Sequence, residues 1–166
     1  YMFVVWMRYL DDSVNGTVYF GTYPSRVRKV TDGSLDSNPY FASVHNRHLV
    51  KNRWYLFVGF INPDTYAGST VSEATGIYDS VTRQRVIFDG TGYRNEFRFE
   101  TGVTQVFMRA FSNGVSTGVR AQFYGAGVYE CNGNEPTIEQ LLSGAYTGTV
   151  AVRPNDLNLK AYYTFD

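Results

Sequence analysis

Residues 53–61 read RWYLFVGFI, and this stretch decides the fold. Aromatic and β-branched side chains follow one another here, and such residues pack well on the pleated surface of a sheet. Apolar residues stand at both odd and even positions, so the segment is apolar on both faces. It is followed by Asn62, Pro63 and Asp64, which are typical turn residues. The stretch predicts a central strand covered on two sides, as in a β-sandwich.

The rest of the chain is dominated by short segments with a period of two. Segments with strand character lie at residues 1–9, 17–21, 27–30, 77–79, 85–88, 93–100, 103–111, 119–124 and 126–129. Asn15-Gly16 is a hairpin signal that predicts pairing of 1–9 with 17–21, and residues 112–114 predict a second such reversal. About ten short strands separated by turn residues indicate an antiparallel β-sandwich.

One segment favours a helix instead. Thr137 and Gln140 have the spacing of a capping box, and Gly144 is a typical terminator. Ile138, Leu141 and Leu142 between them would share one face. We therefore expect an all-β fold with one short helix near residues 137–143.

Composition narrows the classes of function. The 166 residues fit one domain, and 15 basic residues balance 15 acidic ones. This balance argues against a nucleic-acid-binding domain and against a polybasic membrane-surface binder, both of which need a basic surplus. No apolar run approaches the roughly 20 residues of a membrane helix. The 12 Phe, 14 Tyr and 2 Trp instead give an unusually aromatic chain.

The cysteine content and the first residue give expectations about disulfide bonds and about the protein to which the chain belongs. Cys131 is the one cysteine, which excludes an intrachain disulfide, and we expect an inert thiol. The chain begins with Tyr1 inside a predicted strand, which indicates a fragment of a longer protein. Residues 1–166 are predicted to form a single ligand-binding sandwich domain.

Several segments together resemble a known family. They are residues 4–7 (VVWM), 37–41 (SNPYF), 54–59 (WYLFVG), 76–79 (GIYD), 106–111 (VFMRAF) and 134–142 (NEPTIEQLL). The series resembles concanavalin A-like, laminin-G-like jelly rolls, and more closely the modules of phage and contractile-tail fibre proteins and bacterial surface adhesins. Residues 161–166 look like the opening strand of a laminin-G-like domain, so the tail 145–166 is expected to close the sandwich or to serve assembly.

The resemblance implies a receptor-binding function. Such modules attach a viral tail fibre or a surface adhesin to a host-cell glycan or polysaccharide, often as a homotrimer. The implied location is the virion tail fibre or the cell surface, without membrane insertion. A structural or oligomerisation module of a fibre remains an alternative.

A carbohydrate site needs a flat aromatic face and fixed polar groups. Tyr66 lies in a Gly/Ser/Thr loop, and Tyr93 follows Gly90-Thr91-Gly92, so both are candidate ligand-binding residues together with Arg94. Tyr23 is a further loop aromatic. Trp6 and Trp54 stand in apolar strand runs and are expected in the core.

Residues 44–48 (VHNRH) hold the densest group of hydrogen-bonding side chains. His45, Arg47 and His48 are candidate ligand-binding residues, with Arg47 suited to an acidic sugar through bidentate bonds. The two histidines lack a third ligand nearby, so a metal site at this pair is disfavoured. No cofactor is expected; a structural calcium ion bound by turn aspartates stays open, without assigned residues.

The rival class is an enzyme. Residues 94–98 (RNEFR) and 124–129 (YGAGVY) resemble two strands of alginate-lyase-type jelly rolls, but Phe107 stands where the family has His, and the family's Lys is absent. Glu96 and Glu100 would lie about 13 Å apart along one strand, too far for paired-carboxylate hydrolysis. We therefore expect no catalysis, with a polysaccharide lyase or hydrolase as the alternative.

Overall fold

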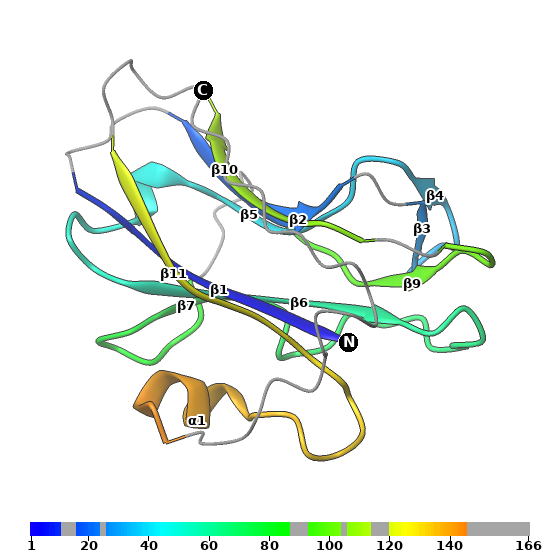
Figure 1. Cartoon of the computed structure of the whole chain (residues 1–166). Helices are drawn as coiled ribbons and strands as arrows, with labels where there is room; N and C mark the ends of the chain where they lie inside the picture. The colour runs from blue at the N-terminus through cyan, green and yellow to red at the C-terminus, as the bar shows by residue number, and fades with distance from the viewer. Residues whose placement is uncertain (11–15, 24–25, 87–92, 104–105, 114–119, 146–166) are drawn as a thin grey trace.

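The computed structural model describes residues 1–10, 16–23, 26–86, 93–103, 106–113 and 120–145. Within these residues the strands form two sheets, with one short α-helix outside them. Figure 1 shows an upper and a lower layer of strands, with the helix beneath the lower one; at the right the last strands of the larger sheet rise to the level of the upper layer. The predicted all-β fold with two layers is confirmed.

The larger sheet, called sheet A here, has the order β11-β1-β6-β9-β3-β4, and β7 also pairs with β6. Its strands are β1 (Met2–Tyr9), β3 (Val27–Lys29), β4 (Leu35–Asp36), β6 (Tyr55–Asn62), β7 (Gly76–Asp79), β9 (Phe97–Phe99) and β11 (Ala121–Tyr129). β6 is the central strand that residues 53–61 predict, since Leu56, Phe57 and Val58 are fully buried and belong to both faces of the sheet.

The smaller sheet, called sheet B here, has the order β10-β2-β5-β8. Its strands are β2 (Thr17–Thr22), β5 (Tyr40–His45), β8 (Tyr93–Arg94) and β10 (Met108–Asn113). All three pairings in this sheet are antiparallel. A 3-10 turn, η1 (Asn46–His48), follows β5.

Phenylalanine rings fill the space between the two sheets. Phe41 lies at the centre, with ring centroids 5.4 Å from Phe3, 5.4 Å from Phe20 and 5.8 Å from Phe97. Gly59 of β6 makes room for it, because a Cβ there would lie 2.0 Å from Cγ of Phe41. β6 can therefore approach the Phe41 ring closely because glycine has no side chain at position 59.

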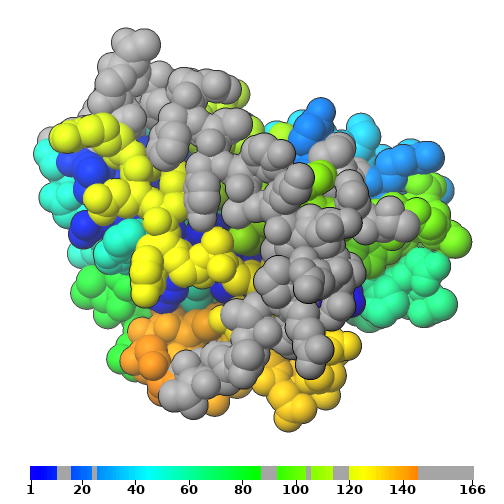
Figure 2. All heavy atoms as spheres, viewed as in Figure 1, coloured from blue at the N-terminus to red at the C-terminus, as the bar shows by residue number. Residues whose placement is uncertain are grey.

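The predicted helix is confirmed as α1 (Ile138–Ser143). Thr137 caps it through a complete capping box with Gln140, and Gly144 ends it in the left-handed conformation. Ile138, Leu141 and Leu142 pack on the outer face of sheet A, against Met2, Val4, Leu56, Val58 and Tyr78. Figure 2 shows the helix in orange, next to the yellow atoms of β11.

The predicted pairing of residues 1–9 with 17–21 is wrong. β1 pairs with β6 and β11 in sheet A, whereas β2 pairs with β5 and β10 in sheet B. The second predicted reversal also joins different sheets, since β10 lies in sheet B and β11 in sheet A. A turn signal does not specify which sheet the next strand joins, and apolar residues on both faces of β1 favour a central position over a hairpin.

Other predicted strands differ in extent, and the strand predicted at residues 103–111 is observed as β10, which begins at Met108. Residues 93–100 are divided between β8 in sheet B and β9 in sheet A. Residues 119–124 and 126–129 were expected as separate strands, whereas β11 is continuous through Gly125, which has a φ of 59° next to the bulge in the β1–β11 register. A glycine in the left-handed region lets the strand bend there without ending.

The tail beyond residue 145 and the loop aspartates Asp11, Asp12 and Asp89 lie outside the described residues. Among the described residues, no helix has the length and apolar character needed to cross a membrane.

We predict that Gly59→Ala destabilises the protein by about 1–3 kcal/mol, the usual cost of overpacking a core, because the new methyl group collides with the Phe41 ring. Urea unfolding followed by circular dichroism measures the change. Gly127→Ala is the matched control, since a Cβ there meets nothing closer than 3.4 Å. Equal stability of the two variants would contradict the tight contact between β6 and Phe41.

Candidate functional site

The outer face of sheet B carries an unusual number of aromatic side chains. Because side chains alternate along a strand, burial of Val18 and Phe20 sends Tyr19 of β2 outward. The residues that gather on this side are Tyr19, Tyr23, Tyr40, Tyr93, Phe111 and Arg109, called the aromatic face below.

Strand register arranges this face in rows. Phe111 pairs with Tyr19, Tyr19 with Ser43, and Ser43 with Tyr93, so one row crosses all four strands of the sheet. In the neighbouring row Arg109 pairs with Gly21, and Gly21 with Tyr40. Gly21 lies at a bulge where a Cβ would be 2.1 Å from the Pro39 carbonyl oxygen. The glycine therefore permits the bend that brings the Tyr40 and Arg109 side chains together.

The rings contact one another directly. Tyr19 and Phe111 are stacked, with centroids 5.1 Å apart and planes 19° apart. Tyr40 lies 4.8 Å from the Tyr19 centroid and 5.7 Å from that of Phe111. These separations are those of favourable aromatic pairs. The three rings therefore form one continuous apolar surface.

The positively charged guanidinium group of Arg109 lies among the rings. Its guanidinium carbon is 4.5 Å from the Tyr40 centroid, 5.1 Å from that of Tyr23 and 5.2 Å from that of Phe111. One terminal nitrogen donates to Asn38 Oδ1 at 2.6 Å. Burial lowers the pKa of Arg109, but an arginine stays charged at any physiological pH. The cation is thus held in place by cation–π contacts and one hydrogen bond.

The outer rim of this face is accessible. Tyr23 is 52% exposed and Tyr93 is 39% exposed. Burial, helped by the nearby Tyr19, Tyr40 and Asp36, raises the pKa of Tyr93 to about 12. The Tyr93 hydroxyl therefore remains protonated and can donate a hydrogen bond to a ligand.

Tyr93 and His45 are the two predicted site residues that share this face. His45 pairs with Thr17, one row along from Tyr19 and Ser43, and by alternation it points to the same side as Ser43. Its Nδ1 accepts a hydrogen bond from the Arg47 backbone N–H at 3.2 Å. The imidazole is thereby oriented at the edge of the aromatic face. Tyr23, considered as a loop aromatic, also belongs to this face.

Arg47 and His48 lie in η1, beyond the end of β5, rather than in the aromatic face. The Arg47 Nε donates to His48 Nε2 at 3.4 Å. Within the part of the chain that the structure describes, no three His, Cys, Asp or Glu side chains are grouped as metal ligands.

Arg94 and Tyr66 lie elsewhere. Arg94 is opposite Ala42 and donates to the carbonyl oxygens of Ser72 and Thr75 at 3.4 and 3.1 Å. It therefore braces the loop before β7 instead of facing a ligand beside Tyr93. The Tyr66 ring lies over Gly68, and its carbonyl oxygen accepts from Arg98 at 3.0 Å.

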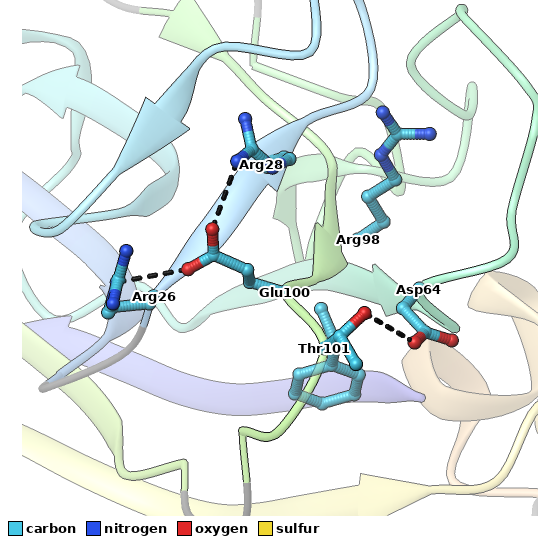
Figure 3. A pocket seen from close by; sticks show the side chains of 7 residues that line it. Arg26, Arg28, Asp64, Arg98, Glu100 and Thr101 are labelled. Carbon is cyan, nitrogen blue, oxygen red and sulfur yellow. Dashed lines mark hydrogen bonds and ion pairs between the residues drawn. The ribbon is translucent and has the colours of Figure 1, made fainter.

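Arg98 belongs to an open pocket of about 540 Å³, shown in Figure 3. Its lining residues are Arg26, Arg28, Asp64, Arg98, Phe99, Glu100 and Thr101. Glu100 lies between two arginines, with Oε2 2.9 Å from Arg26 Nε and Oε1 3.0 Å from an Arg28 nitrogen. Thr101 donates to Asp64 at 3.0 Å. The pocket, called the arginine pocket below, was not foreseen from the sequence.

The expectation that both tryptophans lie in the core is wrong for Trp54. Its ring contacts Tyr124, with centroids 6.3 Å apart, and Arg8, whose guanidinium carbon is 4.7 Å from the ring centroid. Tyr124 is 70% exposed. Trp6 is only partly buried, beside the apolar cluster under α1. A second, smaller aromatic group thus lies on sheet A.

The two carboxylates considered for hydrolysis have other partners. Glu96 is buried, and its oxygens accept from Asn62 Nδ2 and from the Ser72 backbone N–H, each at 2.6 Å. Glu100 forms ion pairs with both Arg26 and Arg28. The carboxylate of Glu96 therefore ties β6 to the loop before β7.

The chain was also compared with known proteins. No family model, no curated protein and no solved structure matches it.

The raised pKa of Tyr93 predicts a pH dependence of stability. The ordinary pKa is 10.0 and the folded value is about 12, so Tyr93 stabilises the fold fully below pH 10 and loses this contribution as the pH rises to 12. Tyr93→Phe should therefore lose less of its free energy of unfolding across that window than the wild type. Urea unfolding at a series of pH values measures this, and identical losses would contradict the burial of the Tyr93 hydroxyl.

Proposed function

We propose that the protein is a non-catalytic carbohydrate-binding module that attaches to a cell-surface glycan through the aromatic face. The observation that carries this proposal is the continuous surface of Tyr19, Tyr40 and Phe111 around the Arg109 guanidinium, on the outside of sheet B. Aromatic rings of this kind ordinarily fill a core, and grouped outside it they favour a binding site.

The chemistry of the face suits a sugar. The C–H groups on one side of a sugar ring pack against the negative face of an aromatic ring, which an exposed tyrosine offers with little loss of side-chain entropy. The hydroxyl groups of the sugar need fixed hydrogen-bonding partners around that ring. The Tyr93 hydroxyl, Asn38 and His45 lie at the rim and supply both donors and acceptors.

A jelly-roll topology is part of the proposal. The chain passes from sheet A to sheet B between β1 and β2, returns to sheet A for β3 and β4, passes to sheet B again for β5, and returns between β5 and β6. It crosses again between β7 and β8, β8 and β9, β9 and β10, and β10 and β11. Repeated crossing between two packed sheets is typical of jelly rolls, in which Greek-key connections span the sandwich.

We infer the biological setting from the resemblance of residues 4–7, 37–41, 54–59 and 134–142 to tail-fibre modules. The module would be the host-attachment part of a phage tail fibre or of a similar adhesin, located on the virion or the cell surface. It would act as a homotrimer, in which three sites increase avidity without new contacts. Sedimentation equilibrium tests this: three times the chain mass is expected, and a monomer would contradict the trimer.

The partners of Glu96 and Glu100 support a function without catalysis. Glu96 is held by Asn62 and Ser72, and Glu100 is shared by two arginines. Neither is arranged as a partner of the other for acid–base chemistry on a glycosidic bond.

The binding proposal is tested on an array of bacterial surface polysaccharides and oligosaccharides, followed by calorimetry with the best-bound sugar. Tyr93→Ala and Tyr23→Ala should each raise Kd by about tenfold, the effect of losing one stacked ring worth ~1.4 kcal/mol. Both side chains are exposed enough that their removal leaves the core intact.

Tyr124→Ala is the matched control, because it removes an exposed tyrosine from sheet A. It should leave Kd unchanged. The proposal is overturned by an array without any bound glycan, or by a sugar whose Kd responds to Tyr124→Ala and not to Tyr93→Ala. A stable oligomer that binds no glycan would favour a structural module, with the aromatic face buried between subunits.

A further inference from the structure

The arginine pocket contains a pair of like charges in an unfavourable position. β3 and β9 are antiparallel neighbours, and Arg28 lies directly opposite Arg98 in their register. Side chains that face each other across a strand pair have Cβ atoms about 4.5–5.5 Å apart, and like charges at such positions destabilise a sheet. Because the repulsion between Arg28 and Arg98 costs stability and the pair lies at an open pocket, we expect the two side chains to have a function there.

The hydrogen bonds of the two arginines leave part of this charge uncompensated. Arg28 donates to the Gly33 carbonyl and pairs with Glu100. Arg98 donates to the Tyr66 carbonyl, and within the described part of the chain it forms no ion pair with a carboxylate. In Figure 3 the two guanidinium groups stand apart from each other. Each has five N–H donors, most of which remain for a ligand.

The charge and size of the pocket fit a small anionic ligand. Three arginines face two carboxylates there, so the pocket is positive by one charge. Its volume of about 540 Å³ lies within the range of about 300–1,000 Å³ that small-molecule sites occupy. The Arg26 side chain is 67% exposed and that of Arg28 is 40% exposed, so a ligand reaches them from solvent.

We propose that the arginine pocket binds the carboxylate of a uronic acid residue, with Arg28 and Arg98 as its donors. A carboxylate between the two guanidinium groups accepts a charge-assisted hydrogen bond from each and cancels their repulsion. Arginine suits this role because its planar group matches the geometry of a carboxylate. The occupant is therefore an acidic polysaccharide or an oligosaccharide derived from one.

The remaining lining residues favour a sugar acid over other anions. Asp64 accepts a hydrogen bond from Thr101 with one carboxylate oxygen, and the other can accept from a sugar hydroxyl. The negative charges of Asp64 and Glu100 oppose a densely charged ligand such as a polyphosphate. Phe99 adds apolar surface to the pocket. One carboxylate accompanied by several hydroxyl groups meets these conditions.

This site is separate from the aromatic face. Its arginines lie on or next to β3 and β9 of the larger sheet, whereas the aromatic face is built on β2, β5, β8 and β10. The inference therefore does not rest on sugar binding by Tyr93 or Tyr40. Tyr93→Ala should leave uronate binding in the arginine pocket unchanged, which separates failure of one proposal from failure of the other.

The test is a titration of the ¹⁵N-labelled protein with trigalacturonate, followed by NMR of backbone amides and arginine Nε–H groups. Saturable shifts are expected at Arg28, Arg98 and Thr101. Neutral galactotriose and a triglutamate peptide should produce much weaker shifts at the same concentrations. Arg98→Gln should weaken trigalacturonate binding by about tenfold or more, since one charge-assisted donor group is lost.

Arg83→Gln is the matched control: it removes the same charge from the surface near α1, where Arg83 pairs with Glu139. It should bind trigalacturonate like the wild type. Equal weakening by Arg98→Gln and Arg83→Gln would show a non-specific charge effect and overturn the proposal. Shifts of equal size with triglutamate, or no saturable shifts with trigalacturonate, would overturn it as well.

Discussion

The packing of phenylalanine rings between the two sheets is the constraint on which the rest of the structure depends. Phe41 contacts Phe20 and Phe3 in the buried layer between the sheets. There is room for the Phe41 ring because residue 59 is a glycine without a side chain. Once Phe20 faces this layer, alternation along β2 sends Tyr19 to the other side of the sheet. The outer aromatic surface is thus a consequence of how the core is filled.

The two candidate sites use arginine in different ways. On the aromatic face, Arg109 lies over the Tyr40 ring and contributes a cation within an otherwise apolar surface. In the arginine pocket, Arg28 lies opposite Arg98 in the register of β3 and β9, and Arg28 also forms an ion pair with Glu100. The first arrangement suits the flat side of a neutral sugar ring, and the second suits a carboxylate. A polymer that contains both kinds of residue could engage both sites.

Local features of the fold could be predicted from the sequence, whereas strand pairing could not. The capping box of Thr137 and Gln140 and the apolar run of β6 depend on neighbouring residues, and both are confirmed. The hairpin at Asn15-Gly16 failed because a turn signal does not say which sheet the next strand joins. Tyr93 could be chosen as a loop aromatic, but its neighbours Tyr19 and Phe111 come from distant segments. That Arg28 lies opposite Arg98 likewise follows only from the register of β3 and β9, which the sequence does not give.

Whether the aromatic face binds sugar is decided by a crystal structure of the protein with the best-bound glycan from the array. We expect a sugar ring stacked within van der Waals distance of the Tyr40 or Tyr93 ring, with a hydroxyl group hydrogen-bonded to Asn38 or His45. A sugar seated instead on Trp54 and Tyr124 of sheet A, with the aromatic face of sheet B empty, would contradict this expectation.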